Sequence, residues 1–425
     1  MRSSLVSERA GRRSPSWLAT AFELPGELDT NALKTALLAW IDRHEALRSG
    51  LFCTEGKMAR ITLNPGSVAL HGKVAGDFAH GAELAGYLED LFDAETDPLA
   101  WPSYVFATVT HADSTTLYLG LDHSNVDGYS ISLIAHEIRE LYAAAVAGGA
   151  AELAEVGSYV DFASLEREDA VRVHSDHETV CRWREFVSSN GGELPGFPAP
   201  VGADDPAAVT KQSGGFDWLL DVAEAKAFDT ACRKSGGNFQ AGVLACLAIA
   251  GHEDTGRREF RALAPFHTRN QARWAHSLGW YVGLAPLDFR VTSGGFHHVM
   301  RDAAAAAEQA RPMAAVPFAR VTELLGVPLD PRFVVSYMDL RHAPGAKQWP
   351  EWKAAALRSR TPHADEVYLW VNRSFEGVYL ASRYPGTELG RTAVPRYVER
   401  VRRIMRQVAA KGSYAVAGLA AHTAS

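Results

Sequence analysis

A histidine, an aspartate and a glycine stand close together in a spacing that suits acid–base chemistry at a carbonyl. His123, Asp127 and Gly128 form the pattern H-x-x-x-D-G within residues 119–128. With 16 His and 36 Gly among 425 residues, chance predicts roughly 0.1 such matches, so the pattern carries information. A neutral imidazole can accept a proton from a hydroxyl or an amine while that group attacks a carbonyl carbon. The sequence therefore indicates His123 as a candidate general base.

Asp127 and Gly128 suit supporting roles beside this histidine. An aspartate four residues further on can brace the loop through a charged hydrogen bond without touching the ring. Gly128 permits a turn or a close backbone approach that a side chain would block. Backbone N–H groups at the start of a following helix are candidates for stabilising an oxyanion. On spacing alone, His123 is as readily a residue that only caps a loop, and both interpretations stay open.

Two strands and a helix are predicted around the motif. Residues 104–110 and 115–121 are short runs rich in β-branched and aromatic side chains, separated by a polar stretch that suits a tight turn. Apolar residues then recur with helical spacing over 131–142, before two consecutive glycines end the pattern. The local order is strand, loop, helix. This order places the histidine at the end of a strand, where its ring can face a cleft.

The rest of the chain is predicted to form further helices and strands on both sides of a stretch rich in proline and glycine, residues 188–206. We interpret that stretch as a linker between an N-terminal subdomain, 16–187, and a C-terminal subdomain, 207–425, after a mobile tail at 1–15. An early helix is expected after an Asp29-Thr30 cap. Later strands are expected near 216–222, 262–266, 283–289, 333–338, 366–372 and 377–382, and later helices near 223–235, 239–250 and 394–411.

Composition excludes several classes of function. The net charge is −7, which argues against nucleic acid or an anionic membrane as a partner. No run approaches the roughly 20 apolar residues of a membrane-spanning helix. The 4 Cys are far apart, so neither a disulfide framework nor a zinc finger is indicated and a cytoplasmic location fits. No zinc-protease motif, Walker loop or G-x-G-x-x-G occurs, so we expect no metal and no permanently bound cofactor.

Three stretches resemble the condensation-domain superfamily and occur along the chain in the same order as in that superfamily. It includes peptide-synthetase condensation domains, polyketide-associated acyltransferases and the chloramphenicol acetyltransferase fold. The first is H-x-x-x-D-G itself. Residues 43–48 (R-H-E-A-L-R) resemble the early R-H-x-x-L-R motif, although the phenylalanine expected three residues later is Leu51 here. Arg269 and residues 277–287 (S-L-G-W-Y-V-G-L-A-P-L) resemble the arginine and the G-x-F-x-N-T-x-P-L stretch that follow. The resemblance covers about residues 17–410.

This resemblance implies an α/β fold with two chloramphenicol-acetyltransferase-like subdomains that form a V-shaped pseudo-dimer with a central tunnel. It implies an acyltransferase in lipid or secondary-metabolite biosynthesis, with His123 as general base. The acyl donor would be a thioester of coenzyme A or of phosphopantetheine on an acyl or peptidyl carrier protein, and the acceptor a hydroxyl. Asp127 would pair with Arg269 and, with Gly128, support the motif. Residues that would tune His123 or line a substrate channel are Asp122, Trp280, Tyr281, Gly283, Ser336 and Tyr337. For Trp280 and Tyr281 the alternative is a place in the core, which aromatic residues next to a strand more often occupy.

Two stretches narrow the resemblance and two positions depart from it. Residues 190–198 (N-G-G-E-L-P-G-F-P) and 334–339 (V-V-S-Y-M-D) look closest to the polyketide-associated acyltransferases. Asp122 stands where peptide-forming relatives usually have a second histidine, and Gly283 stands where the family usually has asparagine. Both departures count against amide-forming peptide condensation and leave ester formation at least as well supported. The alternatives are a stand-alone amide-forming condensation enzyme, which acts on an amine, and a non-catalytic recruitment module of the same fold.

Overall fold

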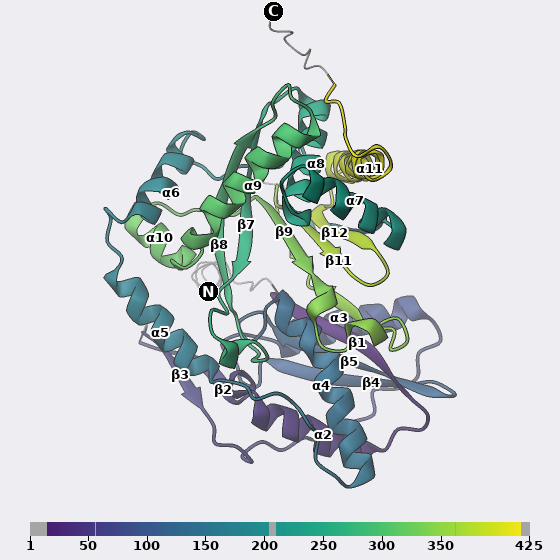
Figure 1. Ribbon diagram of the computed structural model, residues 1–425. Helices are drawn as coiled ribbons and strands as arrows, with labels where there is room; N and C mark the ends of the chain where they lie inside the picture. The colour runs from purple at the N-terminus through teal and green to yellow at the C-terminus, as the bar shows by residue number, and fades with distance from the viewer. Residues whose placement is uncertain (1–14, 56, 204–209, 362, 418–425) are drawn as a thin grey trace, which may run out of the picture. The chain divides into compact units, whose positions relative to one another are not determined.

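A computed structural model describes residues 15–55, 57–203, 210–361 and 363–417, and the chain forms two compact α/β units (Figure 1). The first unit contains the residues up to Arg167 together with Arg269–Tyr281 and His342–Thr361. The second unit contains the remaining stretches. Each unit therefore has its own sheet and its own hydrophobic core.

The predicted subdomain boundaries differ from these units. The linker expected at 188–206 lies inside the second unit, where Leu194, Phe197 and Val201 are buried in the hydrophobic core. The chain instead passes from one unit to the other within a helix, after Arg167. Proline and glycine break regular structure, but they do not prevent apolar neighbours from packing, so this composition was a poor guide to the boundary. The predicted tail at 1–15 lies outside the described residues except for Pro15, as does 204–206 of the predicted linker.

The first unit is built on an antiparallel sheet with the strand order β10-β1-β5-β4. Leu18 pairs with Leu121 and Phe22 with Leu117, so alternate residues of β1 and β5 point toward the same face. The bounds are β1 (Trp17–Pro25), β4 (Tyr104–Thr110), β5 (Ser114–Asp122) and β10 (Ala355–Arg358). The predicted strands at 104–110 and 115–121 are thus confirmed as β4 and β5.

Helices cover both faces of this sheet. Helices α2 (Thr30–Arg43) and α4 (Gly128–Ala147) pack on the face that carries Phe22 and Leu117. On the other face lies α3 (Gly81–Glu95), where Phe92 packs edge-on against Trp17. Asp29 caps α2 by accepting from two backbone N–H groups, as predicted. The unit also contains η1 (Glu45–Arg48), the hairpin of β2 (Ser49–Thr54) and β3 (Lys57–Thr62), η2 (Ala272–Trp274), η4 (Ala346–Gln348) and most of α5 (Tyr159–Arg172), whereas η3 (Leu340–His342) begins in the second unit and ends in the first.

The second unit is built on a mixed sheet with the order β6-β12-β11-β9-β7-β8. Strand β9 runs parallel to both β11 and β7, whereas the other neighbours are antiparallel. Parallel neighbours need a crossover connection, and the crossover from β9 to β11 contains His342–Thr361, which supplies β10 to the first unit. The bounds are β6 (Gln212–Leu220), β7 (Glu259–His267), β8 (Val282–Arg290), β9 (Phe333–Asp339), β11 (Val367–Arg373) and β12 (Val378–Pro385).

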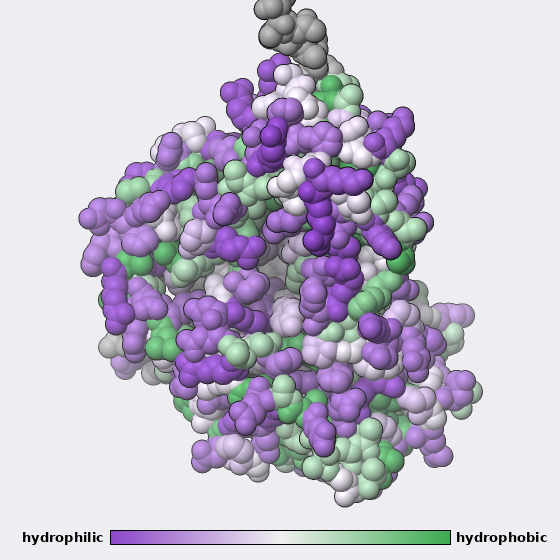
Figure 2. Space-filling model, in the orientation of Figure 1, coloured by the Kyte–Doolittle hydropathy of each residue, from purple (hydrophilic) through white to green (hydrophobic). Residues whose placement is uncertain are grey.

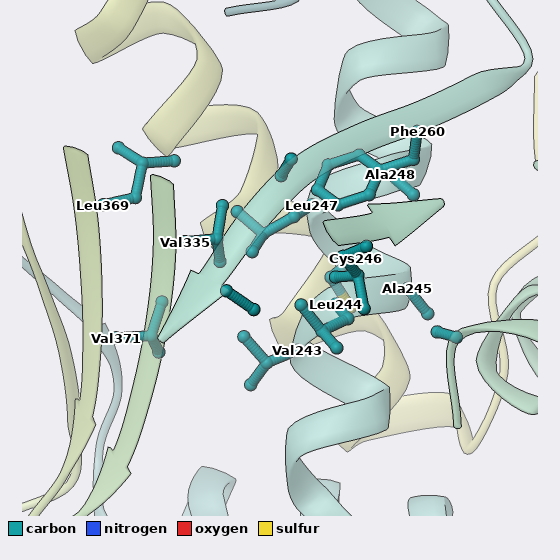
Figure 3. Close-up of a cluster of buried hydrophobic side chains, with 14 of the residues drawn as sticks. Val243, Leu244, Ala245, Cys246, Leu247, Ala248, Phe260, Val335, Leu369 and Val371 are labelled. Carbon is teal, nitrogen blue, oxygen red and sulfur yellow. The ribbon is translucent and has the colours of Figure 1, made fainter. Parts of the chain in front are cut away.

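A helix that is apolar on every side forms the centre of this core. Helix α8 (Phe239–Thr255) is buried along almost its whole length. Its side chains, among them Val243 and Leu247, lie beside Val335 and Val371 of the sheet (Figure 3). The other helices of the unit are α6 (Glu178–Ser188), α7 (Val222–Lys234), α9 (Phe296–Met313), α10 (Phe318–Leu325) and α11 (Glu388–Lys411).

Most predicted elements of the second half are present, with shifted ends. The strand expected at 216–222 is β6, which starts and ends earlier. The last helix begins at Glu388 and not near Val394, because Thr387 caps it by accepting from the N–H of Gly390. Figure 2 shows hydrophilic side chains over most of the surface in view, with scattered hydrophobic ones. None of the helices in the described part of the chain has the length and apolar character that a bilayer span requires.

Candidate active site

The loop between β5 and α4 carries the H-x-x-x-D-G motif and belongs to the first unit. Two backbone hydrogen bonds fix the start of this loop to neighbouring segments of the chain. The N–H of His123 donates to the carbonyl of Ser16 at 2.9 Å, and the N–H of Asp122 donates to the carbonyl of Ser103, also at 2.9 Å. The side-chain amide of Asn125 donates to the Ser103 hydroxyl at 2.7 Å. The loop is therefore fixed by backbone and side-chain hydrogen bonds, as a catalytic loop requires.

One hydrogen bond decides which nitrogen of His123 carries the proton. Nδ1 lies 2.6 Å from the carbonyl oxygen of Val126. Because a carbonyl oxygen can only accept, Nδ1 is the protonated nitrogen of the neutral ring. Nε2 then keeps its lone pair. The geometry gives His123 the tautomer that a general base needs.

The surroundings of His123 lower its pKa below the ordinary value of a histidine. Burial is the largest cause, since it penalises the charged imidazolium. The Val126 carbonyl and the carboxylates of Asp122 and Asp127 act in the opposite direction. The net effect keeps the ring neutral at neutral pH, ready to take up a proton.

Asp122, directly before His123, also holds the loop in place. Its buried carboxylate accepts the N–H of Ser124 at 2.8 Å and the hydroxyl of Ser16. Its charge also raises the pKa of His123, against the effect of burial. Asp122 thus has both a structural contact and an electrostatic influence on the imidazole.

The side chain of Asp127 forms hydrogen bonds that hold the loop to the rest of the first unit. It caps α4 by accepting the N–H of Ser130 at 2.7 Å, and it accepts the N–H of Tyr281 at 3.0 Å. Arg269 donates to both of its oxygens, at 3.0 and 3.1 Å. The side chains of Asp127 and Arg269 are only 1% and 6% exposed. With its oxygens committed in this way, Asp127 braces the loop, and its predicted pairing with Arg269 is present.

Ser130 was not singled out by the sequence, yet it joins the motif helix to a distant segment. Its buried hydroxyl accepts from Arg269 at 2.8 Å and donates to the carbonyl of Gly279 at 3.1 Å. Residues 128–132 (G-Y-S-I-S) match a G-x-S-x-G nucleophile elbow except for the last glycine. A small hydroxyl residue two positions after the motif glycine is the one feature of the sequence that could have indicated this role of Ser130.

Two aromatic residues follow on that segment and have different environments. Tyr281 is fully buried in a cluster with Tyr159, Phe162 and Trp274. Arg269 lies over its ring at 4.0 Å. Tyr281 is therefore a core residue, whereas Trp280 is 38% exposed and its ring centroid lies 4.4 Å from that of His123.

A second buried polar pair, His44 and Glu137, was not singled out by the sequence. His44, from the R-H-x-x-L-R motif, and Glu137 on α4 are both buried, with Nε2 and Oε2 2.6 Å apart. Arg43 and Trp40 also donate to Glu137. Burial alone would raise the pKa of Glu137, but His44 and the two other donors outweigh it, and the pKa is lowered. This cluster joins α2 to α4, the helix that begins at Gly128.

The other three predicted site residues lie in the second unit. Gly283 is in β8, where an added Cβ would lie 1.8 Å from the carbonyl oxygen of Ala314. A side chain at this position would therefore have to displace the backbone. Ser336 and Tyr337 are in β9, and burial raises the pKa of Tyr337. Among the described residues, no group of three or more His, Cys, Asp or Glu side chains is arranged to hold a metal ion.

Comparisons with known proteins identify the family that this chain is similar to. A family model described as the condensation domain matches residues 5–414. Acyltransferase PapA3 of Mycobacterium tuberculosis is 27% identical over 407 residues, which are 93% of this chain and 84% of that protein. From the same organism, 2′-acyl-2-O-sulfo-trehalose (hydroxy)phthioceranyltransferase PapA1 is 30% identical over 310 residues, or 72% of this chain and 59% of that protein.

A solved structure extends the likeness to the fold. The structure described as PapA2 acyl transferase superposes with a TM-score of 0.86 and 25% sequence identity, over 96% of this chain and 90% of that one. The predicted fold class and the resemblance to polyketide-associated acyltransferases are thereby confirmed. The V-shaped arrangement and the central tunnel stay predictions.

Proposed function

The chain belongs to the condensation-domain family, and from this premise we propose that it transfers an acyl group from a thioester to an acceptor hydroxyl, with His123 as general base. It is an acyltransferase, as its named relatives are. The finer proposal rests on one observation above all. Nδ1 of His123 is held by the Val126 carbonyl, so that Nε2 is the nitrogen available for a proton.

The proposed reaction needs no covalent intermediate between the acyl group and the enzyme. Nε2 of His123 takes the proton of the acceptor hydroxyl while the oxygen attacks the thioester carbonyl carbon. The tetrahedral intermediate then collapses, the C–S bond breaks, and the imidazolium returns the proton to the leaving sulfur. The products are an ester and a free thiol. Backbone N–H groups at the start of α4, beside Gly128, are the proposed donors to the oxyanion.

The substrates follow from this chemistry and from the relatives. We propose a donor in which the acyl group is linked to coenzyme A or to carrier-protein phosphopantetheine, since both end in the same thiol. The acceptor is proposed to be a sugar hydroxyl, because the PapA1 relative is named for a sulfated, acylated trehalose. This reaction belongs to lipid assembly, and we propose that it takes place in the cytoplasm. No permanently bound cofactor is part of the proposal.

Mass spectrometry of reaction products tests this proposal. The purified full chain is incubated with long-chain acyl thioesters and, in separate reactions, with trehalose, sulfated trehalose, a simple alcohol and a primary amine. Ester products at the hydroxyl acceptors are expected. Products at the amine alone would support an amide-forming condensation enzyme. No transfer to any acceptor by folded protein would support a non-catalytic recruitment module.

A further inference from the structure

The backbone of Trp280 is held on both sides by the first turn of α4. The preceding residue, Gly279, exchanges hydrogen bonds with the Ser130 hydroxyl, at 3.1 and 3.3 Å. The following residue, Tyr281, donates its N–H to Asp127 at 3.0 Å. These bonds attach Trp280 to the same helix start that supports the catalytic loop.

Close packing also fixes this position. Gly279 has a φ of +159°, and an added Cβ would lie 2.3 Å from the ring of Tyr159. The hydroxyl of Tyr159 in turn forms a hydrogen bond with the backbone of Trp280. The indole therefore projects from a rigid backbone and not from a loop that can drift.

The indole packs against the imidazole of His123, with ring centroids 4.4 Å apart and an interplanar angle of 52°. The hydrogen bond from Nδ1 to Val126 restrains the imidazole at one atom, and the rest of the ring is held only by its bond to Cβ and by what packs against it. A bulky neighbour against the ring restricts its remaining freedom to move. We propose that Trp280 is a positioning residue that holds the imidazole of His123 so that Nε2 points to the acceptor hydroxyl.

Charge around His123 comes from other residues. The carboxylates that act on the imidazole are Asp122 in the strand before it and Asp127 at the helix cap, and Arg269 neutralises the latter. Trp280 adds no charge. Its second contribution is to cover part of the imidazole, and burial is the largest cause of the lowered pKa of His123.

Kinetics of Trp280 variants test this role, which rests on the proposed acyl transfer. Trp280→Ala is expected to lower kcat about 10- to 100-fold, because a small displacement of the base is costly. It should also move the acid limb of the pH–rate profile upward, toward pH ~6.5, and Trp280→Phe should restore most of both. Trp218→Phe is the matched control, since Trp218 is 40% exposed in the second unit. Parental kcat and an unshifted profile for Trp280→Ala would overturn the proposal.

A second measurement needs no activity. The imidazole signals of His123 are assigned by NMR with a His123→Gln variant, and they are titrated without substrate in the parent, in Trp280→Ala and in Trp280→Phe. An upward shift of the midpoint in Trp280→Ala and broadened ring signals are expected. An unchanged titration would overturn the positioning role, whether or not the protein proves to be an acyltransferase. If Trp280→Ala does not fold, Trp280→Leu carries the same comparison.

Discussion

Arg269 donates to both carboxylate oxygens of Asp127, across 142 residues of chain. It also donates to the Ser130 hydroxyl and to the carbonyls of Ser277 and Trp274. One guanidinium thus joins the helix that follows the motif to the segment that carries Trp280. This arrangement makes the pair a support for the site and not a participant in proton transfer.

Removing either partner of this pair should destabilise the first unit. Asp127→Ala leaves the guanidinium of Arg269 buried without its charge partner, which typically costs about 3–5 kcal/mol. Urea unfolding followed by fluorescence measures the loss. Asp169→Ala is the control, because the Asp169–Arg172 pair lies on the surface and should contribute little. An Asp127→Ala protein that is inactive but as stable as the parent would contradict the structural role.

Removing the imidazole of His123 should abolish most of the transfer while the protein stays folded. His123→Ala is expected to lower kcat about 10²- to 10⁴-fold, as measured by thiol release at saturating donor and acceptor. His111→Ala is the matched control, since His111 lies in the exposed turn between β4 and β5. Near-parental turnover by His123→Ala would exclude it as the general base.

The pH dependence of the rate should follow the neutral form of His123. Because the pKa of His123 is lowered, the rate should remain high to below pH ~6.5 and fall only as the pH drops through that lowered pKa. Asp122→Asn removes a charge that raises this pKa but keeps an acceptor for Ser124. The acid limb of kcat/KM should therefore move to still lower pH. An unchanged limb would show that Asp122 serves the loop alone.

A side chain at Gly283 should be poorly tolerated. A Cβ there would lie 1.8 Å from the carbonyl oxygen of Ala314, so Gly283→Ala must displace backbone and should cost about 1–3 kcal/mol or more. Differential scanning calorimetry measures the change in Tm. Gly196→Ala is the control, because nothing lies within 4 Å of its added Cβ. Equal Tm values for the two variants would contradict the close contact.

The elements nearest the site could be predicted because their signals are local. Alternating and helical apolar spacing correctly indicated β4, β5 and α4, and so the position of His123 between a strand and a helix. The short strand β10 had no such signal. Three of its residues, Ala355, Ala356 and Leu357, are exposed, and only pairing with β1 makes it a strand.

By itself, then, the sequence determined the candidate base, the elements on either side of it and, through its motifs, the family. The tertiary structure decided what holds the base in place. Ser130, the His44–Glu137 pair and the packing of Trp280 on His123 all join residues far apart in the chain. Periodicity reports which face of a helix or strand is buried, but not which distant segment covers it, because that depends on how the chain crosses between its two units.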